Sequence, residues 1–277
     1  MSRPVMTSIR VTFQGERGAY SEMATLQYFP NAQLLPKKTI QEVFETIEIG
    51  KVDFAIVPIE NSIEGSINET YDLLLETNML VSGEIYQRIR HCLITNKDTR
   101  SIESVYSHPQ ALAQCRSYLK RKGLEPIPTY DTAGAVKMIK EMNIMNAAAI
   151  ASRRAAEIYK MEIRDDGIED KKNNFTRFLV LSKTMANPTN NDRTSIIFSI
   201  RHVSGALFNI LEEFASRKIN LTKIESRPTK DAPWEYNFYV DFEGHSVDEN
   251  IKYALQSVKK KSAFFKNLGS YKKAEFC

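Results

Sequence analysis

The spacing of apolar residues over 8–183 predicts strands that alternate with amphipathic helices. Apolar side chains at every second position predict a strand over 9–14, and an unbroken apolar run predicts a buried strand over 54–59. Between them, helical spacing predicts a helix on the stripe Ile40, Val43, Phe44 and Ile47. Further short strands are expected at 104–106, 129–130, 147–151 and 178–181. This alternation predicts an α/β domain with a largely parallel sheet.

A polar segment divides the chain in two. Residues 182–193 are rich in Ser, Thr, Asn, Asp and Pro, which is the composition of a linker. A length of 277 residues also agrees with two domains. We therefore predict a first domain over residues 8–183, a linker over 184–193 and a second domain over 194–273.

The second domain shows a different order of elements. Strands are expected over 194–200, 220–226, 236–242 and 263–268, with a helix after the first and after the third. The two helices are predicted from apolar stripes at Leu207, Ile210, Leu211 and Phe214, and at Ile251, Ala254, Leu255 and Val258. The resulting order, βαββαβ, is that of a ferredoxin-like domain. Because such a sheet leaves edges that pair readily with another copy, we expect a homo-oligomer.

The composition of the chain limits the classes of function that are compatible with it. Lys and Arg number 38 against 34 Asp and Glu, and the resulting charge of +4 fits a small anionic substrate without demanding nucleic acid or a membrane. Cys92, Cys115 and Cys277 lie far apart, a pattern typical of a reducing compartment. No apolar run approaches the roughly 18 residues of a membrane span. The four histidines show no metal-ligand spacing and no glycine-rich nucleotide motif occurs, so we expect no metal and no cofactor.

Hydroxyl and amide side chains recur where predicted strands lead into helices. They lie at 15–21, 60–62, 107–110, 131–132, 152 and 174–176. Each one alone is more often a helix N-cap than a ligand. However, strand ends of an open α/β sheet face one crevice, and helix N-termini bind carboxylates. Together they predict a cleft for a small organic anion, but they do not name a reaction.

Several longer motifs occur in a fixed order along nearly the whole chain. They lie at 15–22, 57–65, 107–115, 131–133, 149–152, 174–178 (Asn-Phe-Thr-Arg-Phe), 205–207 and 225–228. As an ordered set they resemble the prephenate dehydratase family with a C-terminal ACT regulatory domain. No helical chorismate mutase segment precedes residue 9, so the chain resembles the monofunctional form.

The resemblance implies both a fold and a reaction. The fold is a two-lobed, periplasmic-binding-protein-like α/β catalytic domain followed by a ferredoxin-like ACT domain. The reaction, catalysed by a carbon–oxygen lyase, converts prephenate to phenylpyruvate, carbon dioxide and water in L-phenylalanine biosynthesis, without metal or cofactor. Because the product ring is aromatic, the enzyme has mainly to hold the dianion in one geometry and place a donor at the leaving hydroxyl.

The resemblance also implies roles for particular residues. The donor at the leaving hydroxyl is Thr176. The substrate-binding residues are Glu60, Asn61, Ser62, Ser107, Gln114, Thr132 and Arg177. Alternatives stay open for three of them: Glu60 could brace a loop, Gln114 could lie on a helix surface, and Arg177 could form a structural ion pair.

In the second domain the resemblance implies an allosteric site for phenylalanine between the ACT domains of two subunits. The residues that match are Gly205, Ala206, Leu207, Glu225, Ser226, Arg227 and Pro228. Gly205 would let the backbone approach the ligand closely. The alternatives are a plain strand-to-helix turn for Gly205 and a solvated charge for Arg227. Either a homodimer or a homotetramer would provide such a site.

Two other functions remain compatible with the sequence. Arogenate dehydratase performs the same reaction on the transaminated substrate, and nothing in the residues separates the two. A non-catalytic amino-acid sensor would use the same cleft and ACT domain, but the intact motif around Thr176 argues against it. The cysteine pattern and the apparent absence of a leader predict a cytoplasmic protein.

Overall fold

The computed structural model describes residues 8–229 and 235–275, which form two compact units. The first unit holds the residues up to Ile67 and residues 85–178. The second unit holds residues 68–84 and the residues from Leu179 onward. The chain therefore passes between the units after Ile67, Glu84 and Phe178.

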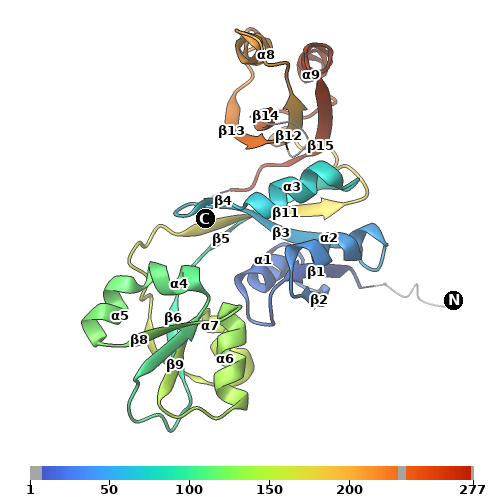
Figure 1. Ribbon diagram of the computed structural model, residues 1–277. Coiled ribbons are helices and arrows are strands. Elements are labelled where there is room, and N and C mark those ends of the chain that lie inside the picture. The colour runs from blue at the N-terminus through green and yellow to red at the C-terminus, as the bar shows by residue number, and fades with distance from the viewer. Residues whose placement is uncertain (1–7, 230–234, 276–277) are drawn as a thin grey trace, which may run out of the picture. The chain divides into compact units, whose positions relative to one another are not determined.

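The first unit has two lobes, each built on its own β-sheet (Figure 1). In the first lobe β1 runs parallel to both β2 and β3, and the strand order is β2-β1-β3-β11-β5 with β4 paired to β3. Strands β5 and β11 continue into the second unit. The elements are β1 (Arg10–Gln14), α1 (Tyr20–Tyr28), β2 (Gln33–Lys37), α2 (Ile40–Glu48), β3 (Phe54–Asn61), β4 (Gly65–Ser66), β5 (Leu80–Arg88) and β11 (Phe175–Ser182).

The apolar pattern of the first lobe becomes its core. Val11 and Phe13 of β1 and Ile56 of β3 are fully buried, as the alternation and the apolar run predict. Helix α2 buries its predicted stripe, including Val43 and Phe44. It begins at a capping box, in which Thr39 accepts from the backbone N–H of Glu42 at 3.1 Å and Glu42 reaches back to the N–H of Thr39.

The second lobe is a mixed sheet with strand order β10-β6-β9-β7-β8. Strand β7 is parallel to β8 and β9, whereas β6 is antiparallel to β9 and β10. Strand β9 carries only alanine and isoleucine and is fully buried, so helices pack closely on it. The elements are β6 (Cys92–Thr95), β7 (Ser104–Ser107), α4 (Pro109–Gln114), α5 (Arg116–Lys122), β8 (Glu125–Pro128), α6 (Thr132–Glu141), β9 (Ala147–Ala151), α7 (Arg153–Tyr159) and β10 (Glu162–Asp166).

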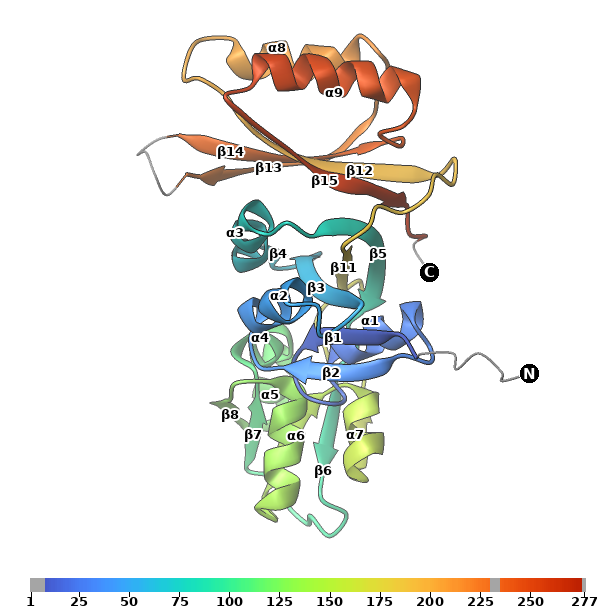
Figure 2. The same ribbon diagram turned by 90° about the vertical axis from the view of Figure 1, so that its right-hand side faces the viewer.

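Most of the second unit is an antiparallel sheet of order β13-β14-β12-β15 with two helices on one face (Figure 2). Phe198, Phe214 and Phe242 fill the space between the sheet and the helices. The elements are β12 (Asp192–Ser199), α8 (Ala206–Ala215), β13 (Leu221–Pro228), β14 (Tyr236–Glu243), α9 (Glu249–Lys261) and β15 (Phe264–Lys272). The βαββαβ order and the α/β fold class are confirmed.

Helix α3 (Asn68–Glu76) packs against the other face of this sheet. The Tyr239 hydroxyl donates to the carbonyl of Tyr71 at 2.8 Å, and the Lys266 ammonium donates to the carbonyl of Leu75 at 2.8 Å. A cation at the carboxyl end of a helix complements its dipole and its free carbonyls. The sequence placed residues 68–84 in the first domain, whereas these contacts place them in the second compact unit.

The start of β12 also differs from the sequence expectation. The strand begins at Asp192, inside the predicted linker. The physical reason is that Arg193 forms a buried ion pair with Glu84 of β5 at 2.6 Å, which fixes the residues before Thr194. Within the described ranges, no helix has both the length and the apolar character needed to cross a membrane.

Candidate active site

A cavity of about 270 Å³ opens in the first unit and is lined by both lobes. Its polar wall includes Tyr20, Asn61, His91, Gln114, Thr132 and Thr176. Apolar side chains, among them Ile40, Pro58 and Phe178, complete the lining. A small cavity in which polar side chains converge beside apolar surface is the usual form of a small-molecule site.

Strand β11 points Thr176 into this cavity. Successive side chains of a strand face opposite sides, and Thr176 and Phe178 both line the cavity. Thr176 is 8% exposed, and its Oγ1 accepts a hydrogen bond from Asn61 Nδ2 at 3.0 Å. Within the described parts of the chain, this is the hydrogen bond that the Thr176 side chain makes. The threonine hydroxyl proton is therefore available to a bound ligand.

The orientation of the Asn61 amide follows from the backbone around it. Asn61 Oδ1 accepts from the N–H groups of Ile63 and Glu64, at 3.0 Å each. The Nδ2 group must then face Thr176, and it also donates to Asn174 Oδ1 at 2.9 Å. The turn after β3 thus fixes the donor that addresses Thr176.

Gln114 continues this network from the second lobe. Its Oε1 accepts from Asn174 Nδ2 at 2.8 Å, and its Nε2 lies 3.4 Å from Glu64 Oε1. Gln114 is the last residue of α4, a short helix that begins with Pro109 at its first position. The structure therefore brings three of the residues from separate motifs, Asn61, Gln114 and Thr176, into one hydrogen-bonded group.

Thr132 lies at the start of α6 beside Asp131, and both line the cavity. Asp131 caps the helix by accepting from the N–H of Gly134 at 2.7 Å. Burial raises the pKa of the Asp131 carboxyl, and the hydrogen bond from Gly134 partly offsets this shift. Asp131 is therefore a carboxyl whose charge is disfavoured by its surroundings.

Four residues of the predicted substrate-binding set lie outside the cavity lining. Ser107 is fully buried and donates to the carbonyl of Ile150 at 2.6 Å. Ser62 accepts from the N–H of Phe175 at 2.9 Å, which ties β11 to the turn after β3. Glu60 pairs with Ser66 between β3 and β4. Arg177 is buried and follows Thr176 on β11, so it faces the opposite side of the strand.

Several residues that line the cavity are not among the site residues predicted from the sequence. Tyr20 and Asp131 lie within recognised motifs but were not assigned a role, and Tyr130 precedes Asp131. His91 lies between β5 and β6 without any partner at recognisable spacing. Its presence in the lining depends on a chain crossing between the lobes, which local sequence does not reveal.

The lining has neutral donors and two histidines, but among the described residues it includes no lysine or arginine. A second cavity of about 180 Å³ shares Gln14, Tyr130 and Asp131 with it. This neighbouring cavity is lined by Lys37 and Lys38. Cationic side chains therefore lie next to the first cavity rather than in it. In the described residues, no group of three His, Cys, Asp or Glu side chains is placed to hold a metal ion.

The second unit contains a separate cavity of about 300 Å³ around the start of α8. Gly205, Ala206 and Leu207 line it together with His202 and Tyr236. Gly205 has a φ of +79°, a left-handed conformation that favours glycine. Of the predicted effector residues, Glu225, Ser226, Arg227 and Pro228 of β13 are not in its lining.

Arg227 instead contacts α3 within the second unit. Its Nη2 lies 3.3 Å from Asp72 Oδ1, and both side chains are partly buried. The ion pair connects a residue of the predicted effector motif to the helix that follows the Asn61 turn in sequence. The solvated-charge alternative for Arg227 is therefore wrong.

Fold and cavities together define a two-lobed α/β domain with a small-molecule cavity, joined to a ferredoxin-like domain with a cavity of its own. Comparison with known proteins gives the family. A model described as prephenate dehydratase matches residues 11–186, and one described as ACT domain matches residues 194–260. The chain is 44% identical to arogenate dehydratase/prephenate dehydratase 2 of Arabidopsis thaliana, over 95% of this chain and 72% of the relative. The chain belongs to the prephenate dehydratase family, and it is an enzyme of the lyase class.

Two solved structures are similar along nearly the whole chain. Prephenate dehydratase from Arthrobacter aurescens, solved in complex with L-Phe, has a TM-score of 0.88 and 29% identity, covering 96% of this chain and 90% of that one. A protein described as a quorum quenching acylase has a TM-score of 0.87 and 31% identity, covering 96% and 98%. The fold therefore supports the family assignment. Because proteins of one fold can differ in function, the reaction depends on the residues of the site.

Proposed function

We propose that this chain converts prephenate to phenylpyruvate, carbon dioxide and water, as a step of L-phenylalanine biosynthesis. The observation that carries the proposal is the hydroxyl of Thr176, which lines the cavity and accepts a hydrogen bond from Asn61 at 3.0 Å. A hydrogen bond accepted by an O–H group makes that group a better donor. Thr176 is thereby suited to donate to a leaving hydroxyl.

The reaction balances with one proton and no redox partner. The bond between the ring and its carboxylate breaks, and its electron pair moves through the ring to expel the hydroxyl at the opposite carbon. The dianion and one proton give carbon dioxide, water and the phenylpyruvate anion. Thr176 donates a hydrogen bond to the departing oxygen or passes it a proton, and a positioned donor of this kind contributes about 10² to 10³ in rate.

The cavity lining offers neutral hydrogen-bond donors, and two lysines lie in the adjoining cavity. This arrangement can bind a dianion and still allow one of its carboxylates to leave. Strong ion pairs to the departing carboxylate would stabilise the ground state, whereas neutral amides position it at less cost to the barrier. We place the ring within the 270 Å³ cavity, near Asn61, Gln114 and Thr132. Lys37 and Lys38, which line the adjoining cavity, attract the second carboxylate of the substrate.

Arogenate is the second candidate substrate, and Asp131 is the observation that favours it. Arogenate carries an ammonium group where prephenate carries a keto group. Asp131 lines the cavity, and an ammonium would stabilise its carboxylate, whereas a dianion would raise its pKa further. The plant relative also carries both activities in its name.

We further propose that phenylalanine binds at the cavity around Gly205, Ala206 and Leu207 and inhibits the reaction. The Arthrobacter aurescens protein was solved in complex with L-Phe, which supports binding of phenylalanine by this chain. Four residues of β13 would contribute to this phenylalanine site, either from the strand end of a second subunit or indirectly through α3. They are Glu225, Ser226, Arg227 and Pro228. The proposal requires a homodimer or a homotetramer. The isolated cysteines support a location in the cytoplasm.

The test is turnover by the purified chain at neutral pH, with prephenate and arogenate supplied separately and a reaction without protein as the blank. Formation of phenylpyruvate from prephenate, slowed by added phenylalanine, is the expected result. Formation of phenylalanine from arogenate alone would establish the second candidate. No product from either substrate would overturn the proposal, and phenylalanine binding without turnover would establish the sensor.

A further inference from the structure

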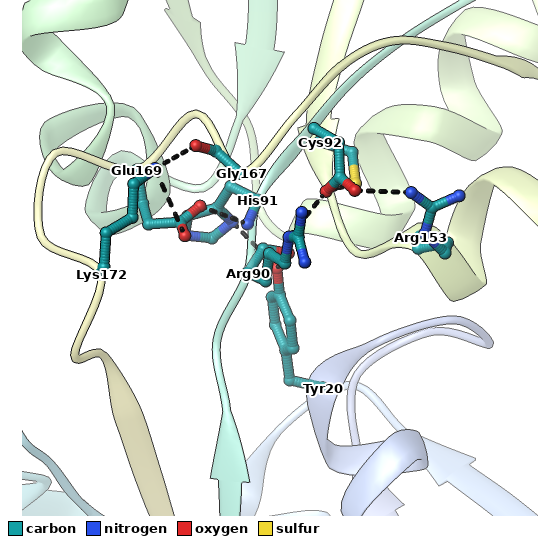
Figure 3. Close-up of polar contacts among 9 residues, drawn as sticks. Tyr20, Arg90, His91, Cys92, Arg153, Gly167, Glu169 and Lys172 are labelled. Atoms are coloured by element: carbon teal, nitrogen blue, oxygen red, sulfur yellow. Dashed lines mark hydrogen bonds and ion pairs between the residues drawn. The ribbon is translucent and has the colours of Figure 1, made fainter.

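His91 connects the two lobes through its side chain. Its Nδ1 lies 3.0 Å from the hydroxyl of Tyr20 on α1, and its Nε2 lies 3.0 Å from Oε1 of Gln114 on α4. Figure 3 shows Tyr20 pointing from the first lobe toward Arg90 and His91. The Tyr20 hydroxyl also donates to the carbonyl of Arg90 at 2.7 Å. His91 is therefore the link between Tyr20 and the amide network of the cavity.

The hydrogen-bond network determines which ring nitrogen of His91 carries the proton. The backbone N–H groups of Ile63 and Glu64 hold Oδ1 of Asn61, so Asn61 presents its NH₂ to Asn174 Oδ1. Asn174 must then present its own NH₂ to Gln114, and Gln114 its Oε1. An acceptor at Gln114 requires a donor at His91 Nε2. The neutral ring consequently has Nε2–H, and its unprotonated Nδ1 shares the single Tyr20 proton with the Arg90 carbonyl.

The surroundings of His91 keep this arrangement neutral. Burial lowers the pKa of the His91 ring, and the Gln114 hydrogen bond and the charge of Glu169 only partly offset the shift. Burial also raises the pKa of Tyr20, so its hydroxyl stays protonated and able to donate.

The backbone around His91 is fixed as well. Glu169 accepts from the His91 N–H at 3.0 Å and lies 3.9 Å from Lys172. Asp166 lies 3.0 Å from Arg90 and 2.5 Å from Arg153, and its Oδ1 accepts from the thiol of Cys92 at 3.3 Å. These contacts hold the chain on both sides of His91, so the ring has little freedom to leave Gln114.

We propose that His91 is a positioning residue for the dehydratase reaction, acting as a neutral Nε2–H donor that fixes the Gln114 amide in the cavity wall beside Asn174 and Thr176. This inference rests on the proposed function. Without the Nε2–H donor, Gln114 Oε1 keeps only the hydrogen bond from Asn174, and Gln114 Nε2 keeps its 3.4 Å contact with Glu64. The Gln114 amide is then held less firmly, and a substrate that contacts it is positioned less precisely against Thr176.

The variants that test this inference separate the donor from the ring. In His91→Gln the side-chain NH₂ reaches the place of Nε2 and keeps a donor for Gln114, whereas His91→Leu fills similar space without one. We expect kcat to fall about 10- to 100-fold in His91→Leu and to stay within about fivefold of wild type in His91→Gln. Equal losses in His91→Gln and His91→Leu would overturn the proposal, as would wild-type kcat in His91→Leu.

A second measurement does not depend on turnover. The ¹H–¹⁵N spectrum of imidazole-labelled protein distinguishes the two neutral tautomers, and His91→Gln identifies the His91 signals among the four histidines. We expect Nε2–H with an unprotonated Nδ1. The Nδ1–H tautomer or a charged ring at neutral pH would overturn the inference. If the wild type turns over neither substrate, the proposed function fails while the tautomer is still determined.

Discussion

Asn61 donates a hydrogen bond from Nδ2 to Oγ1 of Thr176 over 3.0 Å, while its own Oδ1 is held by two backbone N–H groups. The direction of this bond matters more than its presence. Because Thr176 accepts from Asn61, its single proton is left for a ligand in the cavity. A threonine hydroxyl is a poor acid, so its use as a donor depends on being held and polarised in this way.

Changing Asn61 to aspartate should lower kcat about 10- to 100-fold, equivalent to about 1.4 to 2.8 kcal/mol. The carboxylate keeps the shape of the amide but cannot donate to Thr176, and it would draw the threonine proton toward itself. Steady-state kinetics on prephenate measures the change. Asn31→Asp, at an exposed turn, is the matched control and should leave kcat unchanged. A wild-type kcat in Asn61→Asp would show that the reaction does not need a hydrogen bond donated from residue 61 to Thr176.

Gly18 sets how closely the lobes of the first unit approach. Its φ is +90°, and a Cβ built on it would lie 2.7 Å from the Cα of Ala155 on α7. Ser152 also donates to the Gly18 carbonyl at 2.5 Å, so the backbones meet directly. Gly18→Ala should therefore lower both Tm and kcat, since the clash adds to the roughly 1–2 kcal/mol of a left-handed alanine.

The control for this variant is Gly123→Ala. Gly123 has a φ of +67°, but no atom lies within 4 Å of a Cβ built there. It carries the conformational cost alone, so the difference in unfolding free energy between the two variants isolates the close approach. Equal losses of Tm in the two variants would show that the lobes separate freely at Gly18.

Acid should destabilise the protein through His91. Burial lowers the pKa of His91 below its ordinary value of 6.5, so the unfolded chain takes up a proton at a pH where the folded ring stays neutral. As the pH falls through the unfolded pKa, the unfolded state binds more protons and the free energy of unfolding decreases. One such group contributes a slope of at most about 1.4 kcal/mol per pH unit. Urea unfolding at several pH values measures the free energy of unfolding as a function of pH. The slope of this dependence should be shallower in His91→Gln than in the wild type. Identical slopes would contradict a lowered pKa of His91 in the folded protein.

The ion pair between Arg227 and Asp72 should carry part of the response to phenylalanine. Arg227 belongs to the predicted effector motif, and Asp72 lies on α3, which follows the Asn61 turn along the chain. Asp72→Asn removes the charge on one side, so we expect a higher phenylalanine concentration for half-inhibition, within the about 1–3 kcal/mol usual for allosteric coupling. Asp53→Asn, which breaks the exposed Arg10–Asp53 pair, is the control. If phenylalanine inhibits Asp72→Asn as strongly as the wild type, α3 does not transmit the effect of phenylalanine to the active site.

Local sequence predicted many of the elements and several of the residues that meet in the cavity, but the strand expected at 129–130 was wrong, because β8 covers Glu125–Pro128. Alternation at Val11 and Phe13 and the stripe at Val43 and Phe44 became buried faces because their periodicity is a direct consequence of strand and helix geometry. Asn61, Gln114, Thr132 and Thr176 line the cavity, while their chemical roles stay predictions. Ser107 and Arg177 do not line it, because motif membership does not tell which side of a strand faces the ligand.

Features made by distant segments could not be predicted in this way. His91 has no recognisable neighbour in sequence and finds Tyr20 and Gln114 only where the chain crosses between lobes. The start of β12 depends on Arg193 reaching Glu84. Both relationships join segments far apart along the chain, and neither leaves a periodic signal.

The most direct test of the account is the rate of phenylpyruvate formation by Thr176→Ser and Thr176→Val beside the wild type. Serine keeps the hydroxyl, whereas valine keeps the shape of threonine and removes only the donor. We predict that Thr176→Ser retains a substantial part of kcat and that Thr176→Val loses about 10² to 10³. A Thr176→Val protein that folds normally and turns over prephenate at the wild-type rate would contradict the account.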